Sequence, residues 1–288
     1  MPTPTILTSA AGLLSGYDVL LCDVWGVLHD GRLAYAGAND CLPRYRARGG
    51  TVVLVSNAPM TGIAIAQLLD DKGVRRDCWD AIVGSGDIAL AHIAEKNYAR
   101  VYGIGPRPRD NSFFDGVPNL VDDLASADAI ACTGLLHEHT ETAEDYRCLL
   151  ENALTRRLPF VCVNPDLAVH VGADLLPCAG AIAALYETMG GAVFWCGKPH
   201  PSAYIMGLQV AEKLRGQAIT KSRVLGIGDA IRTDLRSAEI AGVDALLIAQ
   251  GLHRDEVVVN GKVDAARLTE LLTRTNATPK ATMVGLAW

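Results

Sequence analysis

Short runs of apolar residues recur along the chain and predict strands that are buried on both faces. Uninterrupted apolar runs, as opposed to alternating apolar and polar positions, are typical of a parallel sheet covered by helices. Helices are expected at residues 62–71 and 235–241, with Gly73 and Gly242 ending them. Alternating strands and helices predict an α/β fold with a Rossmann-like, doubly wound parallel sheet. The predicted strands are residues 19–22, 52–55, 224–227 and 245–249.

The long stretch between the second and third of these strands has the pattern of a second α/β domain. We expect strands at residues 100–104, 129–132 and 159–163, and helices at residues 142–155 and 180–190. The economical arrangement is a smaller α/β cap domain inserted into the first domain. We therefore predict a discontinuous core domain of residues 1–83 and 193–288, and a cap domain of residues 84–192.

Composition and charge exclude several classes of protein. The chain has 288 residues, of which 50% are hydrophobic and 20% are charged, which is typical of globular domains. Its formal net charge is −6 and it has no basic stripe, so we expect no nucleic-acid partner. No apolar run approaches the ~20 residues of a membrane span. Residues 1–11 lack a basic start, so they do not resemble a secretion signal, and we expect a cytoplasmic protein.

Eight cysteines are present, but they form no closely spaced pair. Zinc sites are usually built from such pairs, and most of these cysteines lie within apolar runs, as Cys22 and Cys162 do. We therefore expect small buried thiols in a reducing compartment.

Polar side chains follow the predicted strands at the edge where open parallel sheets bind their ligands. Clustered carboxylates repel one another unless a cation lies among them, and oxygen ligands favour a hard ion such as Mg²⁺. A lysine beside them would bind a phosphate and keep the nucleophilic carboxylate ionised. This combination predicts phosphoryl transfer to a carboxylate. The residues concerned are Asp23, Ser56, Asn57, Lys198, Asp229 and Asp234.

Four sequence motifs in order resemble those of the haloacid dehalogenase-like (HAD) superfamily. Leu-Cys-Asp-Val-Trp-Gly-Val-Leu at residues 21–28 resembles the first motif, and Ser-Asn at residues 56–57 the second. Gly-Lys-Pro at residues 197–199 resembles the third, and Gly-Asp-Ala-Ile-Arg-Thr-Asp at residues 228–234 the fourth. Their order and separations agree with the superfamily over nearly the whole chain, which implies a hydrolase.

The position of the inserted domain resembles one subclass of this superfamily. The insert falls between the second and third motifs, as in the NagD-like phosphatases of subclass IIA, which carry a large α/β cap. Asn-Pro-Asp at residues 164–166 and Cys-Ala-Gly-Ala-Ile at residues 178–182 are similar to that subclass. The subclass also suggests a homodimer, by analogy alone.

The resemblance implies catalytic and metal-binding roles. Asp23 would attack phosphorus and form an aspartyl-phosphate. Asp229 would bind Mg²⁺ together with Asp23 and the backbone carbonyl of Trp25. Asp234 would support the metal ion or Lys198.

It also implies substrate-binding roles. Ser56 and Asn57 would hydrogen-bond the phosphoryl group of a small phosphorylated metabolite. Asn164 and Asp166 would lie on the cap or its hinge and face the leaving group. The sequence does not indicate which metabolite is bound.

One position departs from the pattern of the family's phosphatases. They place a second aspartate, the general acid and base, two residues after the nucleophile, and here that residue is Trp25. An indole N–H can only donate a hydrogen bond, whereas a positioned acid–base group contributes typically ~10²–10⁴-fold to the rate. His29 could substitute for it, but Asp30-Gly31 is a typical hairpin turn pair and favours an exposed His29.

Three functions are therefore compatible with the sequence. The first is a phosphatase with a replacement acid or an easy leaving group. The second is a hydrolase or transferase that uses the same aspartate on another type of bond. The third is a phosphate-ligand-binding or regulatory protein with little turnover. Because a non-catalytic descendant has no need of Asp23, Lys198 and Asp229 together, their presence favours an enzyme.

Overall fold

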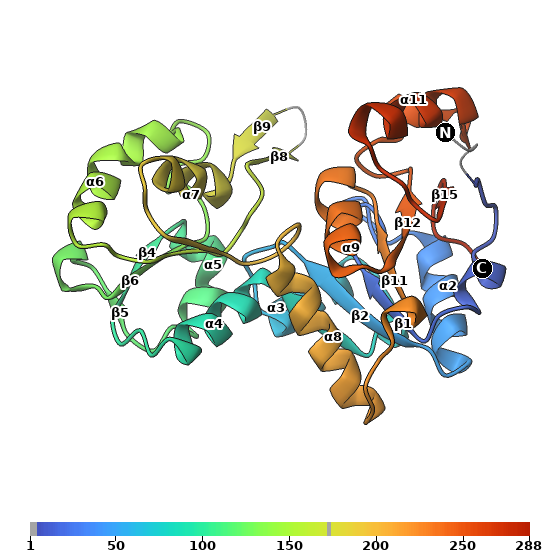
Figure 1. Cartoon of the computed structure of the whole chain (residues 1–288), viewed down its shortest axis with the longest axis horizontal. Helices are drawn as coiled ribbons and strands as arrows, with labels where there is room; N and C mark the ends of the chain where they lie inside the picture. The colour runs from blue at the N-terminus through green and yellow to red at the C-terminus, as the bar shows by residue number, and fades with distance from the viewer. Residues whose placement is uncertain (1–4, 172–173) are drawn as a thin grey trace. The chain divides into compact units, whose positions relative to one another are not determined.

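The computed structural model describes residues 5–171 and 174–288, and the chain forms two compact units (Figure 1). The predicted boundaries of the core and cap domains stay a prediction. The two units differ from them because residues 57–64 and 193–202 belong with the second unit. The first, called the core unit, comprises Met1–Ser56, Ile65–Val83 and Ala203–Trp288; the second, called the cap unit, comprises Asn57–Ala64 and Gly84–Ser202.

The core unit is built on a six-stranded sheet with β1 between β11 and β2. β1 pairs in parallel with both neighbours, and β11 pairs in parallel with β12. Every residue of β1 and β11 is buried, as expected of strands covered on both faces. In sheet order the strands are β15 (Ala281–Met283), β12 (Asp244–Ile248), β11 (Val224–Gly228), β1 (Val19–Cys22), β2 (Thr51–Ser56) and β3 (Ala81–Gly84).

The helices of the core unit end and begin at residues suited to those positions. Gly242, with φ 71°, ends α9 in the left-handed conformation that glycine adopts without strain. Asp264 begins α11 by accepting hydrogen bonds from the backbone N–H groups of Ala266 and Arg267. The helices are α1 (Ala11–Leu14), α2 (Ala36–Ala47), α3 (Gly62–Asp71), α8 (Pro201–Arg215), α9 (Arg236–Ala241), α10 (Arg254–Val257) and α11 (Ala265–Thr275). Shorter elements are η1 (Arg76–Cys78), η4 (Lys221–Arg223), the π-helix η5 (Ile231–Leu235), and the strands β13 (Val258–Val259) and β14 (Lys262–Val263).

The cap unit contains a second parallel sheet, with five strands, and an antiparallel pair, β8 and β9. Its core includes Phe160 and Tyr186, whose rings lie 5.5 Å apart between centroids. In sheet order the strands are β10 (Val193–Trp195), β7 (Phe160–Cys162), β6 (Ala129–Cys132), β4 (Val101–Ile104) and β5 (Leu120–Val121); the antiparallel pair is β8 (Ala168–Val171) and β9 (Asp174–Pro177). The helices are α4 (Ser85–Glu95), α5 (Arg107–Phe114), α6 (Arg147–Thr155) and α7 (Ala179–Thr188), with short turns η2 (Leu124–Ser126) and η3 (Ala143–Tyr146).

The predicted fold class is confirmed, and most element bounds shift by one or two residues. α3 has the predicted bounds. The single helix expected at residues 142–155 is instead a 3-10 turn, η3, followed by α6. The edge strand β15 was not predicted from the apolar pattern, because its three residues, Ala-Thr-Met, give no recognisable run.

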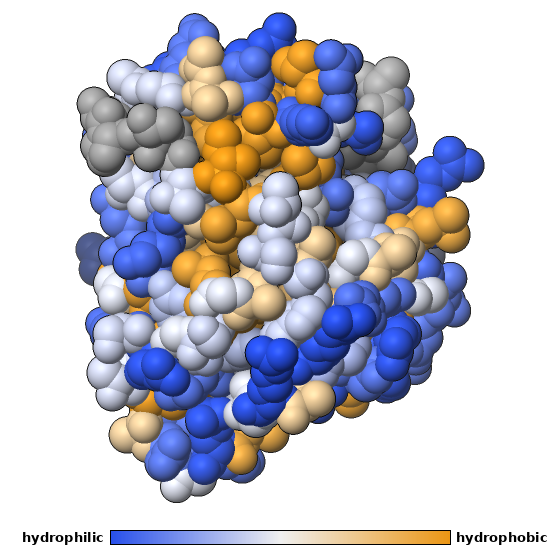
Figure 2. Space-filling model, turned by 90° about the vertical axis from the view of Figure 1, so that its right-hand side faces the viewer, coloured by the Kyte–Doolittle hydropathy of each residue, from blue (hydrophilic) through white to orange (hydrophobic). Residues whose placement is uncertain are grey.

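Figure 2 shows one face on which hydrophobic residues, in orange, form a strip among hydrophilic ones. Within the described residues no helix combines the length and apolarity that crossing a membrane would require. All eight cysteines lie in the described part of the chain and are thiols outside any disulfide, and only Cys148 is exposed.

Candidate active site

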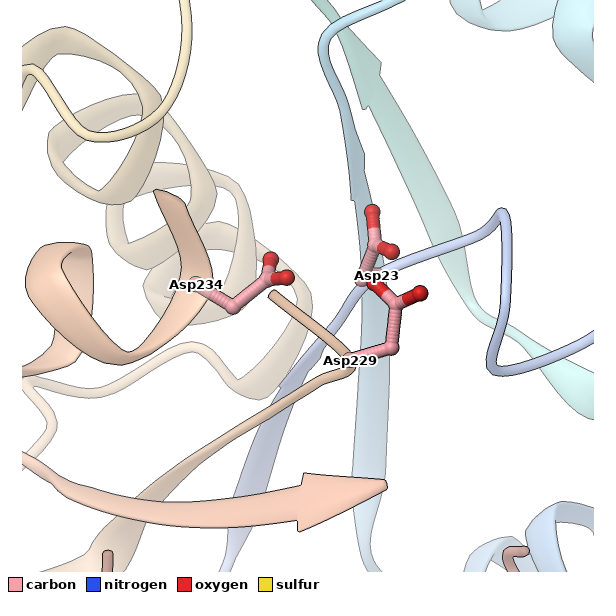
Figure 3. A group of neighbouring side chains, drawn as sticks. All are labelled: Asp23, Asp229 and Asp234. Atoms are coloured by element: carbon pink, nitrogen blue, oxygen red, sulfur yellow. The ribbon is translucent and has the colours of Figure 1, made fainter. Parts of the chain in front are cut away.

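Three carboxylates that are distant in sequence meet at the carboxyl edge of the core sheet. Asp23 follows β1, Asp229 follows β11, and Asp234 lies in η5. One ligand atom from each lies within 4.8 Å of those of the other two. Figure 3 shows Asp23 and Asp229 at the ends of adjacent strands, with Asp234 extending toward them from its helix. The parallel register, in which Cys22 is opposite Ile227, brings these strand ends together.

The carboxylate of Asp229 is enclosed by two glycines. An added Cβ would lie 2.1 Å from Asp229 Oδ2 at Gly26 and 2.0 Å from it at Gly251. The backbone N–H of Leu252 donates a hydrogen bond of 2.7 Å to the same oxygen. Asp229 is only 7% exposed, so its position depends on the two neighbours having no side chain.

Asp234 is held by the backbone of the same loop. Its Oδ2 accepts a hydrogen bond of 3.1 Å from the N–H of Ala230. At Gly228 an added Cβ would lie 2.1 Å from Asp234 Cγ, so the side chain lies directly against the end of β11. The N–H of Leu235 bonds to the carbonyl of Ala230, five residues earlier, which is the pattern of a π-helix. Such single π turns are frequent at functional sites.

The donor set of this cluster fits a hard divalent cation. Three carboxylates so close together repel one another in a partly buried site unless positive charge lies among them. Oxygen ligands of this kind are those that Mg²⁺ and Ca²⁺ prefer. Asp23, Asp229 and Asp234 are therefore the residues that could hold such an ion. The expected role of the Trp25 carbonyl as a further ligand stays a prediction.

Within the cap unit, Asn57 is bonded to the main chain of Lys198 in both directions. Its Nδ2 donates to the Lys198 carbonyl at 2.8 Å, and its Oδ1 accepts from the Lys198 N–H at 2.8 Å. Nδ2 also donates to Asp166 Oδ1 at 3.0 Å. Three residues that the sequence singled out thus lie together. The side chain of Asn57 positions the segment that carries Lys198, which is itself 3% exposed.

The neighbouring loops explain other residues of the sequence motifs. Asn164 Oδ1 accepts a hydrogen bond of 3.1 Å from the N–H of Asp166 and closes a tight turn. An added Cβ at Gly180 would lie 2.5 Å from the Asp166 carbonyl oxygen. Gly197, with φ 122°, has Asn57 Oδ1 2.7 Å from the position of an added Cβ. The close approach of these backbones therefore requires glycine.

Ser56 lies at the same edge of the core sheet as the carboxylates. It is the last residue of β2, which pairs in parallel with β1 so that Leu54 is opposite Cys22. The half-buried Ser56 side chain thus lies at the end of the strand next to the one that Asp23 follows. Its predicted bond to a phosphoryl group remains a prediction.

Trp25 and His29 differ sharply in exposure. Trp25 is 59% exposed, whereas His29 is 1% exposed, and their ring centroids are 5.6 Å apart. The expectation that His29 is an exposed hairpin residue is therefore wrong. The turn lies one residue later in the chain than predicted, because Asp30 Oδ1 accepts hydrogen bonds from the N–H groups of Arg32 and Leu33.

His29 is held in its neutral form. Burial, assisted by the charge of Lys72 and opposed by that of Asp30, lowers the pKa of His29 from 6.5 to about 4. Its Nδ1 accepts a hydrogen bond of 2.9 Å from the N–H of Gly31, so the ring proton lies on Nε2. A histidine that is neutral at pH 7 carries no extra proton to give to a leaving group, so His29 is unsuited to the role of general acid.

One part of the site, the Gly251-Leu252 pair, was missed by the sequence reasoning. These residues lie shortly beyond the end of β12, a strand that was predicted, and they enclose Asp229. The rule that ligands bind at the carboxyl ends of parallel strands could have identified them. Neither residue of the pair has a charged or polar side chain that would single it out in the sequence.

Comparisons with known proteins agree with this arrangement. Residues 20–116 match the family model described as haloacid dehalogenase-like hydrolase, and residues 195–282 match a second model described as HAD-hydrolase-like. A crystal structure of a haloacid dehalogenase-like hydrolase from Brucella suis is 38% identical, with a TM-score of 0.81, covering 97% of this chain and 99% of that one.

Two curated enzymes are also similar. Ribonucleotide monophosphatase NagD from Escherichia coli is 25% identical over 236 residues, covering 81% of this chain and 88% of NagD. Dihydroxyacetone phosphatase from Corynebacterium glutamicum is 30% identical over 97 residues, a match that spans only 33% of either chain. The chain belongs to the haloacid dehalogenase-like hydrolase family, as a NagD-like member and a phosphatase or related hydrolase.

Proposed function

We propose that this protein is a Mg²⁺-dependent phosphatase that hydrolyses a small phosphate monoester through an aspartyl-phosphate at Asp23. The observation that supports the proposal is the cluster of Asp23, Asp229 and Asp234, whose ligand atoms lie within 4.8 Å of one another. A carboxylate at a strand end, beside two more buried carboxylates, is suited to act as a nucleophile next to a bound cation.

The reaction follows from the chemistry of these residues. A carboxylate oxygen of Asp23 attacks phosphorus, the bond between phosphorus and the leaving oxygen breaks, and that oxygen departs with the electron pair. Water then attacks the aspartyl-phosphate, which releases inorganic phosphate and regenerates the carboxylate. Asp229 and Asp234, with Asp23, would hold the ion, which supplies positive charge for the phosphoryl oxygens when bound.

Binding of the phosphoryl group is assigned to Lys198, Ser56 and Asn57. Lys198 supplies a positive charge, and Ser56 a hydroxyl. The side-chain atoms of Asn57 already bond to Lys198 and Asp166. We therefore assign to the Asn57 side chain the positioning of Lys198, and to its backbone N–H any direct bond to the phosphate.

Names of similar enzymes support a small phosphorylated metabolite as the substrate. One relative is a ribonucleotide monophosphatase and another a dihydroxyacetone phosphatase, so both act on small phosphate esters. Asn164 and Asp166 belong to the cap unit and remain our candidates for contact with the leaving group. A cytoplasmic location and a homodimeric state of the protein also remain expectations.

A second function is favoured by one observation. Trp25 occupies the position of the general acid, and the buried His29 beside it is neutral, so neither of these two residues is suited to protonate the leaving group. A protein that binds a phosphorylated ligand with little turnover would tolerate this loss. A hydrolase that acts on another type of bond would tolerate it too.

The deciding experiment is a phosphate-release assay on an aryl phosphate, with Mg²⁺ and after its removal by chelation. We expect Mg²⁺-dependent release that is abolished in Asp23→Asn. The matched control is Asp71→Asn, at the exposed end of α3, which should retain wild-type release. A pure preparation that is inert on a broad panel of phosphate esters would favour the binding protein.

A further inference from the structure

We propose that Trp25, together with Leu252, forms an apolar platform beside the carboxylates that selects aryl phosphates as substrates. The inference rests on the proposed function and specifies its substrate class. Both side chains are large and exposed, at 59% for Trp25 and 58% for Leu252. Single exposed apolar residues are common on protein surfaces, so the argument depends on where these two are attached.

Both residues are attached directly to the backbone that encloses Asp229. Trp25 precedes Gly26 and Leu252 follows Gly251, and an added Cβ on either glycine would lie within 2.1 Å of Asp229 Oδ2. The N–H of Leu252 is itself bonded to that oxygen. Each of these two exposed apolar residues is therefore the neighbour in sequence of a glycine that lies against the Asp229 carboxylate.

The indole of Trp25 is supported by the hairpin that follows it. Its six-membered ring lies against Gly31, where an added Cβ would be 2.8 Å from Trp25 Cζ2. Gly31 has φ 91°, and its carbonyl accepts a hydrogen bond of 2.5 Å from Lys72 Nζ. The ring of His29 lies beside the indole at 5.6 Å. The indole is thus held in place and still mostly exposed, as a stacking surface requires.

The chemistry of the leaving group also favours aryl phosphates as substrates. The indole, which occupies the position of the expected acid, cannot protonate the departing oxygen. An aryl oxide can leave without an acid: it departs with the electron pair of the broken bond between phosphorus and oxygen, and afterwards takes a proton from water. An alkoxide is far more basic and leaves poorly without an acid. An aryl group also offers a flat apolar face to the indole, so one class of substrate satisfies both features.

The test compares two substrates whose leaving groups are similarly acidic but differ in shape. Phenyl phosphate has a planar leaving group, whereas the leaving group of hexafluoroisopropyl phosphate is not planar. We expect the wild type to prefer phenyl phosphate by about 2- to 10-fold in kcat/KM, which corresponds to the typical strength of one aromatic pair. Trp25→Ala should remove this preference mainly through a higher KM, and Trp25→Phe should retain most of it. Leu214→Ala, an exposed leucine on α8, is the control and should retain the preference.

A third substrate separates the platform from the proposed function. Acetyl phosphate has a leaving group that needs neither protonation nor stacking. Its hydrolysis, if it requires Mg²⁺ and Asp23, therefore tests the proposed phosphatase function without testing the platform. If acetyl phosphate is hydrolysed in this way but Trp25→Ala retains the wild-type preference for phenyl phosphate, the platform is refuted and the function stands. If none of the three phosphate compounds is hydrolysed, both proposals fail. Circular dichroism of Trp25→Ala confirms that any change arises in a folded protein.

Discussion

Asn57 holds Lys198 through both polar groups of the lysine's main chain, with a 2.8 Å bond to its N–H and a 2.8 Å bond to its carbonyl. A single side chain therefore fixes the segment that carries Lys198, which we propose as the phosphate-binding cation. Because Asn57 follows directly after the strand β2, the second sequence motif positions the third. Asn57 and the segment that carries Lys198 are therefore linked within the cap unit.

Replacing Asn57 by alanine should weaken both activity and stability. The substitution removes the two bonds to Lys198 and the one to Asp166, each of which contributes about 0.5–1.5 kcal/mol net. We expect a rise in KM for phosphate esters and a melting temperature lower by several degrees. Kinetics and thermal unfolding measure these effects. Asn152→Ala, at an exposed position of α6, is the control, and equal effects in the two variants would contradict the positioning role.

Replacing Gly251 by alanine should weaken metal binding. A Cβ at this position would lie 2.0 Å from Asp229 Oδ2, so the carboxylate must move. Gly12→Ala is the matched control, because nothing lies within 4 Å of an added Cβ there. Calorimetric titration with Mg²⁺ should show a dissociation constant raised roughly 10-fold or more in Gly251→Ala, which corresponds to about 1.4 kcal/mol. An unchanged titration would refute the assignment of Asp229 as a ligand.

Restoring the missing acid tests the role of position 25. Trp25→Asp should raise turnover of alkyl phosphates by roughly 10²-fold at most, the lower end of the gain from a positioned acid. Trp25→Asn has nearly the same shape but no proton to donate, and should bring no such gain. Steady-state kinetics on an alkyl phosphate distinguish the two. A loss of turnover in Trp25→Asp would show that the site requires the indole for another purpose.

His29 should make the stability of the fold depend on pH. Its pKa is lowered from 6.5 to about 4 on folding, so the unfolded chain binds the proton more readily. Stability is therefore fully present above pH 6.5 and is lost as the pH falls toward 4, by of order 3 kcal/mol in total. Denaturant unfolding at pH 7 and at pH 4.5 should show a smaller loss in His29→Gln than in the wild type. His139→Gln, at an exposed position, should behave as the wild type does.

The sequence predicted those parts of the fold and site that depend on strong local patterns. The buried apolar strands β1 and β11 identified the core sheet, and the parallel register then accounts for the meeting of Asp23 and Asp229. The burial of His29 could not be predicted, because the pair Asp30-Gly31 indicates a turn but not which neighbouring side chains are buried beside it.

Contacts that join distant segments were also beyond the sequence. The bond between Asn57 and Asp166 connects residues 109 positions apart, and no local pattern encodes it. The enclosure of Asp229 by Gly26 and Gly251 likewise becomes visible only when both loops are placed beside the strand ends.

The most direct measurement is a crystal structure of the protein with Mg²⁺ and orthovanadate, which mimics the phosphoryl group during transfer. The proposed function predicts vanadium at bonding distance from an Asp23 carboxylate oxygen, the ion bound by Asp23 and Asp229, and Lys198 Nζ bonded to a vanadate oxygen. Vanadate bound away from Asp23, or an ion that does not contact Asp229, would contradict it.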